Sequence, residues 1–293
     1  GVLSDVEKLG GKTGEFGGAE IPFGSLRMNY RKHGKIMVVD AKVAYLGGFN
    51  IGDAYLGKGE LGEWRDTHMK IEGNAVLTLQ SRFFMDWNAV AKEKNRKDYA
   101  EAYFPIADQK GNTAMQIVAS GPDDEDQTIK MGFLKMISQA KESIYIQTPY
   151  FIPDESLHEM LKIAVLSGVK VKIMIPSKPD HPFVYRATEY FAKDIVEYGA
   201  EVYMYQNGFL HSKVMVVDDE IVSVGTANMD VRSFKLNFEI NAFIYDRDVA
   251  EELIANFDED QKNCIRATHD YFAKQSKWRK FKQAFSRLLS PIL

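Results

Sequence analysis

The sequence predicts an α/β fold made of two homologous lobes, each a mixed β-sheet flanked by helices. Three observations support this prediction: a polar motif occurs twice, strand-like and helix-like segments alternate between its copies, and 293 residues suffice for about two domains. The apolar content of 45% is enough to build packed cores.

The repeated motif is His-x-Lys followed by a hydrophobic run and an aspartate. It occurs at residues 33–40 as HGKIMVVD and at residues 211–218 as HSKVMVVD. In each copy a glycine follows the histidine by 14 residues and an asparagine by 17. The copies begin 178 residues apart, a separation that is too long for a solenoid repeat and that fits two homologous domains.

Between the two motifs, strand and helix signals alternate in the order of βαβ units. Short apolar runs predict strands, amphipathic runs predict helices, and Gly168 and Gly199 lie where two helices should end. The predicted strands are residues 115–119, 143–147, 169–175 and 201–205, and the predicted helices are residues 128–141, 154–167 and 189–198. The second motif then forms a hairpin of strands at residues 213–217 and 221–224.

The first copy has less chain in front of its histidine than the second. The second lobe has 96 residues from Met115 to His211, whereas only 32 precede His33, so about 64 residues of equivalent structure have no counterpart. Because the sequence also begins with Gly rather than Met, we expect a first lobe that is incomplete at its N-terminus. The predicted division is an incomplete first lobe at residues 1–112, a second lobe at 113–265 and a basic amphipathic tail at 266–293.

Charge is distributed unevenly along the chain. The net charge of −4 divides into +6 for residues 266–293 and −10 for residues 1–265. An acidic body argues against a nucleic-acid partner, because that affinity depends on neutralising phosphates. In the tail, four apolar residues recur at helical spacings of three and four: Trp278, Phe281, Phe285 and Leu288. We expect this helix either to contact anionic lipid or to pack on the second lobe with a solvated basic face.

The recurring polar residues suit chemistry at a phosphate group. His33 and Lys35, like His211 and Lys213, are two residues apart, so in an extended segment both side chains point to the same face. An imidazole can attack phosphorus or transfer a proton near pH 7, and ammonium and amide groups stabilise phosphoryl oxygens. Two copies therefore provide one histidine to attack and one to protonate the leaving alkoxide.

Other candidate residues support the two histidines. Asn50, Asn228 and Thr226 are the candidates for binding the phosphate. A histidine with this role requires a carboxylate at its second ring nitrogen, and Asp66 and Glu239 are the candidates for orienting the two imidazoles.

The aspartates that close the two motifs, Asp40 and Asp218, are included with the catalytic residues. Each follows a strand at a turn, where Asp is favoured for local reasons, so a structural role is the alternative. No carboxylate cluster has the spacing of a metal site, and we expect neither a metal nor another cofactor.

Two H-x-K-x4-D motifs, each followed by G-x-x-N, resemble those of the phospholipase D superfamily. Stretches along nearly the whole chain are also similar to the bacterial cardiolipin synthase family, among them residues 66–73, 148–154 and 205–211. The resemblance implies two phospholipase D-type lobes that transfer a phosphatidyl group without a metal. One histidine attacks the phosphodiester of a phosphatidylglycerol, glycerol leaves, and a second phosphatidylglycerol displaces the histidine to give cardiolipin.

The same resemblance implies an anionic membrane surface as partner and a full-length protein held in the bacterial cell membrane by helices that precede this sequence. His33 is assigned as the nucleophile and His211 as the acid and base, although the near-symmetry of the lobes leaves the reverse assignment open. The sequence carries no signal for the oligomeric state.

Other functions remain as alternatives. They are a phospholipid hydrolase, a phosphatidylserine synthase, a nuclease and a non-catalytic phospholipid-binding module. The −10 balance of residues 1–265 argues against the nuclease, and the intact His, Lys and Asn in both copies argue against loss of catalysis.

Overall fold

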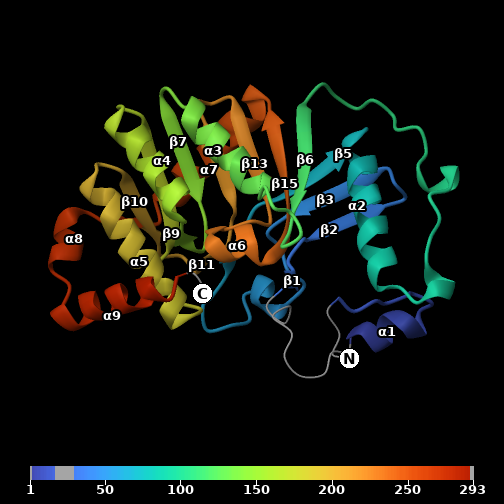
Figure 1. Cartoon of the computed structure of the whole chain (residues 1–293), viewed down its shortest axis with the longest axis horizontal. Coiled ribbons are helices and arrows are strands. Elements are labelled where there is room, and N and C mark those ends of the chain that lie inside the picture. Colours follow the sequence, from blue (N-terminus) through green and yellow to red (C-terminus); the bar gives the residue numbers. More distant parts are fainter. Residues whose placement is uncertain (1, 17–29, 291–293) are drawn as a thin grey trace.

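The computed structural model describes residues 2–16 and 30–290, and its largest feature is a nine-stranded sheet (Figure 1). The strand order is β1-β15-β13-β12-β7-β9-β10-β16, and β6 also pairs with β15. The strands are β1 (Arg31–Lys32), β6 (Ala114–Ser120), β7 (Ser143–Gln147), β9 (Lys170–Pro176), β10 (Glu201–Tyr205), β12 (Val214–Val217), β13 (Ile221–Gly225), β15 (Asn237–Tyr245) and β16 (Cys264–Arg266). Strands β7, β9 and β10 are parallel neighbours, whereas β12, β13 and β15 are antiparallel, so the sheet is mixed.

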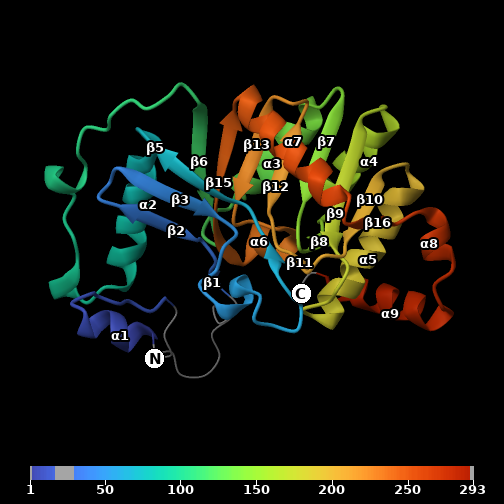
Figure 2. The ribbon, with the colours of Figure 1, turned by 180° about the vertical axis from the view of Figure 1, so that it is seen from behind.

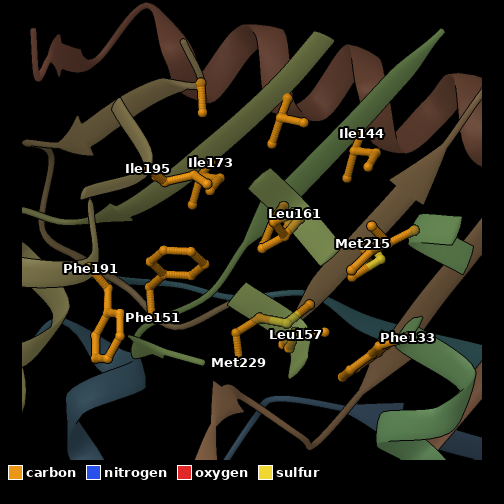
Figure 3. Close-up of a cluster of buried hydrophobic side chains, with 14 of the residues drawn as sticks. Phe133, Ile144, Phe151, Leu157, Leu161, Ile173, Phe191, Ile195, Met215 and Met229 are labelled. Carbon is orange, nitrogen blue, oxygen red and sulfur yellow. The ribbon is translucent and has the colours of Figure 1, made fainter. Parts of the chain in front are cut away.

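Helices cover both faces of this sheet. One face packs against α3 (Thr128–Gln139), α4 (Glu155–Leu166) and α5 (Pro182–Glu197). Figure 3 shows this core, in which Ile144 and Ile173 of the sheet meet Phe133, Leu157 and Leu161 of the helices. Full burial of such side chains contributes about 1.5–3 kcal/mol each. Helix α7 (Arg247–Gln261) contacts the opposite face (Figure 2).

The first motif lies in a separate three-stranded antiparallel sheet. It consists of β2 (Ile36–Val39), β3 (Val43–Gly47) and β5 (His68–Glu72), and it packs against α2 (Ala75–Val90). Ala44, Leu46 and Ile71 of this sheet are buried against Val222 and Val224 of β13. The two sheets therefore share a hydrophobic core, and the motif strands of the first copy occupy the same hairpin arrangement as those of the second.

Most second-lobe elements lie where the sequence predicts them. Strands 143–147 and 201–205 are confirmed residue for residue, and Gly199 ends α5 in the left-handed region at a φ of 111°. The predicted helix at 189–198 instead begins at Pro182, seven residues earlier. Proline suits the first helical turn because it has no N–H that could be left unsatisfied there, so the polar segment before it ends at residue 181.

The remaining elements are short. Two further strand pairs are β4 (Trp64–Arg65) with β11 (Phe209–Leu210) and β8 (Phe151–Ile152) with β14 (Met229–Asp230). The remaining helices are α1 (Val2–Lys8), α6 (Val231–Lys235), α8 (His269–Ala273) and α9 (Lys277–Leu288), with 3-10 turns η2 (Asp53–Leu56), η3 (Glu93–Asn95) and η4 (Glu101–Tyr103). Over residues 2–16 and 30–290, no helix has both the length and the apolar character needed to cross a bilayer.

The predicted boundary at residue 112 lies in the irregular stretch between η4 and β6. Strand β1, from the first copy, nevertheless pairs in parallel with β15 of the second copy. The division at 1–112, 113–265 and 266–293 therefore stays a proposal, and residues 17–29 and 291–293 of its outer parts lie outside the described residues.

Candidate active site

Two short parallel strand pairs join the repeated copies. Strand β1 pairs with the start of β15, and the backbone N–H groups of His33 and Gly34 donate to the carbonyl oxygen of Phe238 at 2.9 Å. In the same way β11 pairs with β4, and the N–H of His211 donates to the carbonyl oxygen of Arg65 at 2.7 Å. Each motif histidine is thus placed beside a strand of the other copy.

The carboxylates that orient the two imidazoles are exchanged between the copies. His33 Nδ1 lies 2.8 and 2.9 Å from the two carboxylate oxygens of Glu239, and His211 Nδ1 lies 2.7 Å from Asp66 Oδ2. Both carboxylates have fully buried side chains. The sequence identifies these two acids but not the exchange, because the exchange follows from the pairing of β1 with β15 and of β4 with β11.

The two motif lysines lie at the same site. Each precedes its motif strand and donates from Nζ to the carbonyl oxygen of its own histidine, at 2.7 Å for Lys35. Burial lowers the pKa of Lys35 to about 8 and that of Lys213 to about 7. The charges of Asp66 and Glu239 raise the pKa of both lysines and so oppose the effect of burial. The two carboxylates and the two lysines therefore lie close enough to interact electrostatically.

The two histidines differ in their surroundings. The His33 side chain is 28% exposed and that of His211 is 7% exposed. Burial and the neighbouring charge of Lys213 lower the pKa of His211 to about 3, so this imidazole is neutral at pH 7 in the unliganded site. Burial alone would raise the pKa of Asp66, but the bond with His211 and the charge of Lys213 outweigh it and the pKa is lowered.

A tyrosine that the sequence analysis did not identify completes this site. The hydroxyl of Tyr55, in η2, donates to Asp66 Oδ2 at 2.9 Å and lies 2.8 Å from His211 Nδ1. Burial and the charge of Asp66 raise the pKa of Tyr55, so the hydroxyl stays protonated. In the other copy Thr226 has the matching role and donates to Glu239 Oε2 at 2.6 Å.

Comparison of the two copies explains why Asp66 needs a hydroxyl donor from outside the motif. Gly48 stands at the position that corresponds to Thr226 and has no hydroxyl to offer. A Cβ at Gly48 would lie 2.0 Å from Asp66 Oδ1, so the close approach of this carboxylate requires glycine there. The donor for Asp66 therefore has to come from elsewhere in the chain.

Comparisons with known proteins agree with the duplicated site. Residues 133–261 match the family described as cardiolipin synthase, PLD-like domain. The chain is 54% identical over 288 residues to a cardiolipin synthase of Listeria welshimeri and 53% identical over 292 residues to one of Staphylococcus aureus. These matches support the resemblance of the chain to the phospholipase D superfamily.

These alignments cover 98% and 99% of this chain but 60% and 59% of the two synthases, so the chain spans about 60% of the length of these relatives. A phosphatidylserine synthase from Haemophilus influenzae has a similar fold, with a TM-score of 0.65 at 18% identity. That structural match covers 89% of this chain and 71% of the synthase chain. It supports the phospholipase D-type lobe architecture.

Within this site, the three residues expected at the phosphate have different surroundings. Thr226 is fully buried, and its hydroxyl donates a hydrogen bond to Glu239. This residue therefore positions the carboxylate, which corrects the expectation that it contacts the phosphate. Asn228 is buried and donates to Asp230 Oδ2 at 3.1 Å. Asn50 is exposed. A phosphate-binding role for the two asparagines remains a prediction.

Asp218 has a structural role, which corrects its inclusion among the catalytic residues, and Asp40 occupies the matching turn of the first copy. Asp218, at the far end of β12 from the histidine, accepts three hydrogen bonds of 2.7–2.9 Å from the backbone N–H groups of residues 141–143. Asp40 is exposed, and both residues have a left-handed φ, of 53° and 52°, in a tight turn. The carboxylate of Asp218 therefore fixes a turn and is not available to the histidines.

The described part of the chain contains no group of three or more His, Cys, Asp or Glu side chains that could hold a metal ion. A cavity of about 1240 Å³ lies between β5, residues 109–113 and α7. Asp66 is one of its lining residues, whereas neither the motif histidines nor the motif lysines line it.

Proposed function

We propose that this site transfers a phosphatidyl group from one phosphatidylglycerol to another, giving cardiolipin and glycerol through a phosphohistidine intermediate. One observation carries the proposal: two imidazoles, each held at Nδ1 by a buried carboxylate of the opposite copy, lie in one site with the half-buried Lys35 and the buried Lys213. The 54% identity to a cardiolipin synthase supports the choice of donor and acceptor.

In the first step His33 is the nucleophile. Glu239 accepts a hydrogen bond from the Nδ1–H of His33, which leaves the lone pair on Nε2 free to attack phosphorus. The new P–N bond forms as the P–O bond to glycerol breaks, and His211 donates a proton to the departing oxygen. Lys35 and Lys213 balance the negative charge of the phosphoryl oxygens, which electrostatic stabilisation of the transition state requires.

Before it acts as an acid, His211 must take up a proton. The positive charge of Lys213 is one of the two main causes of its low pKa, and a bound phosphodiester anion counters that charge. In the second step the neutral His211 accepts the hydroxyl proton of the incoming phosphatidylglycerol. That oxygen attacks phosphorus, the P–N bond breaks, and both histidines return to their starting states.

Product analysis with the chain and phosphatidylglycerol vesicles in a chelating buffer tests this proposal. Cardiolipin and glycerol are the expected products. Phosphatidic acid in their place would mean that water is the acceptor and would make the protein a hydrolase. Parallel reactions with a serine acceptor and with DNA test for a phosphatidylserine synthase and a nuclease, and vesicle binding without any product would mean a binding module.

The trapped intermediate identifies the attacking histidine. Acid-free quenching and mass spectrometry of peptides should find the phosphatidyl adduct on the peptide containing His33. An adduct on the His211 peptide would exchange the two roles and leave the rest of the proposal intact. We further propose that the site works at an anionic membrane surface, where its lipid substrates lie.

A further inference from the structure

Helix α9 packs on the protein through polar residues. Gln283 and Ser286 are its buried residues, and Gln283 donates to Glu189 of α5 at 3.0 Å. Arg279 forms an ion pair with the same glutamate, which is only 1% exposed. A buried charge that is paired and hydrogen-bonded in this way fixes the helix against α5. The sequence left open whether this helix contacts lipid or packs on the second lobe. The structure shows that it packs on the second lobe, and that it does so through polar contacts.

The apolar side of α9 points away from the protein. Its four large apolar residues are strongly exposed: Trp278 63%, Phe281 59%, Phe285 49% and Leu288 73%. At 3.6 residues per turn they occupy an arc of about 80°, roughly opposite to the buried residues. A helix that exposes its apolar stripe is expected at an interaction surface, since soluble proteins bury such stripes.

Basic residues border this exposed stripe. Lys277 lies on one side of it and Lys282 on the other, where Lys282 Nζ is 5.1 Å from the centre of the Trp278 ring. Next to Trp278, a groove of about 380 Å³ opens between α9 and the start of α5, and Arg186 also lines it. Lysine and arginine at the edges of an aromatic stripe match the charge of anionic headgroups above an acyl layer.

Helix α9 lies on the same edge of the molecule as the candidate active site. In both views of the ribbon, α9 runs along the lower side of the molecule, and β1 and β11 lie in its lower half as well, nearer the middle (Figures 1 and 2). The segment that contains Tyr55 belongs to this edge, because its hydroxyl contacts His211. That segment exposes two more apolar side chains, Ile51 at 101% and Leu56 at 68%.

We propose that α9 is an interfacial helix that docks the protein on an anionic phospholipid bilayer, with Trp278, Phe281, Phe285 and Leu288 in the acyl boundary and the active-site edge toward the lipid. The proposal rests on the proposed function only in the choice of phosphatidylglycerol as the lipid. It gives the site direct access to a substrate that stays in the membrane.

Binding to sedimenting vesicles tests this docking. The chain should bind vesicles of phosphatidylglycerol in phosphatidylcholine and bind pure phosphatidylcholine much more weakly. The triple variant Trp278→Ser, Phe281→Ser, Phe285→Ser should bind at least about tenfold more weakly. Its matched control, Ile163→Ser with Leu166→Ser, changes exposed apolar residues of α4 (57% and 70%) and should bind like the wild type.

A charge variant separates the electrostatic contribution. Lys277→Gln with Lys282→Gln should weaken binding about tenfold or more at low salt and less at high salt, whereas Lys141→Gln with Lys170→Gln should not. Arg279 is left unchanged because it anchors the helix to Glu189. In vesicles of brominated phosphatidylglycerol, the tryptophan emission should be quenched, and Trp278→Phe should remove that quenching while binding persists.

The outcomes separate this inference from the proposed function. Unchanged vesicle binding by the triple variant would overturn the docking proposal, as would loss of binding by the α4 control alone. Concentration-dependent dimerisation that the triple variant abolishes, without vesicle binding by the wild type, would assign the stripe to a second copy of the chain and overturn it too. Vesicle binding by a wild type that forms no cardiolipin would support docking and contradict the proposed function.

Discussion

Replacement of Asp66 by Asn should damage the site more than replacement of Glu239 by Gln. Asp66 Oδ1 accepts the N–H of Thr67 at 2.8 Å, and Oδ2 faces both His211 Nδ1 and the Tyr55 hydroxyl. Asparagine has one acceptor oxygen, which the Thr67 N–H holds in place. Its amide NH2 group therefore points at His211 Nδ1.

An NH2 group in that position reverses the tautomer of His211. Nδ1 must then accept, so the ring proton moves to Nε2, the nitrogen that exchanges protons with the substrate. The variant also lacks the carboxylate that stabilises an imidazolium. A wrong tautomer at a catalytic histidine costs about 10³ to 10⁴ in kcat, or about 4 to 5.5 kcal/mol in the activation free energy.

Glutamine at position 239 can keep its histidine in place. Glu239 Oε1 lies 2.9 Å from His33 Nδ1 and accepts the Asn237 amide at 3.1 Å, so an oxygen there serves both donors. The glutamine NH2 then faces Thr226, whose hydroxyl can turn and accept. Only the charge is lost, and we expect a decrease in kcat of about 10- to 100-fold.

The assay is initial-rate formation of cardiolipin by purified variants of matched thermal stability, together with 15N chemical shifts of the histidine rings. Asp66→Asn should change the tautomer of His211 and leave the His33 ring unaffected, and Glu239→Gln should perturb only His33. Equal losses of kcat or a larger loss for Glu239→Gln would refute the tautomer argument. A change at the histidine of the same copy would refute the exchanged pairing.

Further predictions concern the same groups. His33→Asn and His211→Asn should each leave less than about 1% of the wild-type rate of cardiolipin formation; more than a tenth in either variant would contradict the two-histidine mechanism. The pKa of Lys213 falls from 10.5 to about 7 on folding, so between these pH values the unfolded chain binds more protons and the stability contribution of this group rises with pH. Thermal unfolding of the wild type relative to Lys213→Met should show that rise while kcat/KM falls above pH 7, and a parallel pH dependence of the two proteins would count against it. Tyr55→Phe should lower kcat about tenfold without unfolding the protein, because it removes one donor from Asp66; an unchanged pH–rate profile and rate would show that this hydroxyl is not used.

The duplicated motif made much of the fold and site predictable. Strands 143–147 and 201–205 follow from short apolar runs bounded by polar residues, and the motif histidines and lysines recur at fixed offsets. A repeat preserves the side chains that a site needs but also those that a turn needs. Asp218 belongs to the second group, and its three backbone partners at residues 141–143 come from a loop that the motif spacing does not reveal.

Other features depend on contacts between distant segments. Glu239 and Asp66 could be selected as acids, but their exchange requires β1 to pair with β15, across more than 200 residues of chain. Tyr55 was missed because it replaces a hydroxyl that the repeat lacks at Gly48. The orientation of α9 was also hidden, since periodicity defines an apolar stripe without indicating which side of the helix meets the protein.

The stereochemical course of the reaction tests the phosphohistidine mechanism most directly. A phosphatidylglycerol donor with a chiral phosphorothioate is converted by the protein, and the configuration at phosphorus of the cardiolipin product is determined. Attack by His33 followed by attack of the second lipid gives two in-line displacements, so the configuration should be retained. Inversion would show a single direct transfer between lipids and would contradict a covalent histidine intermediate.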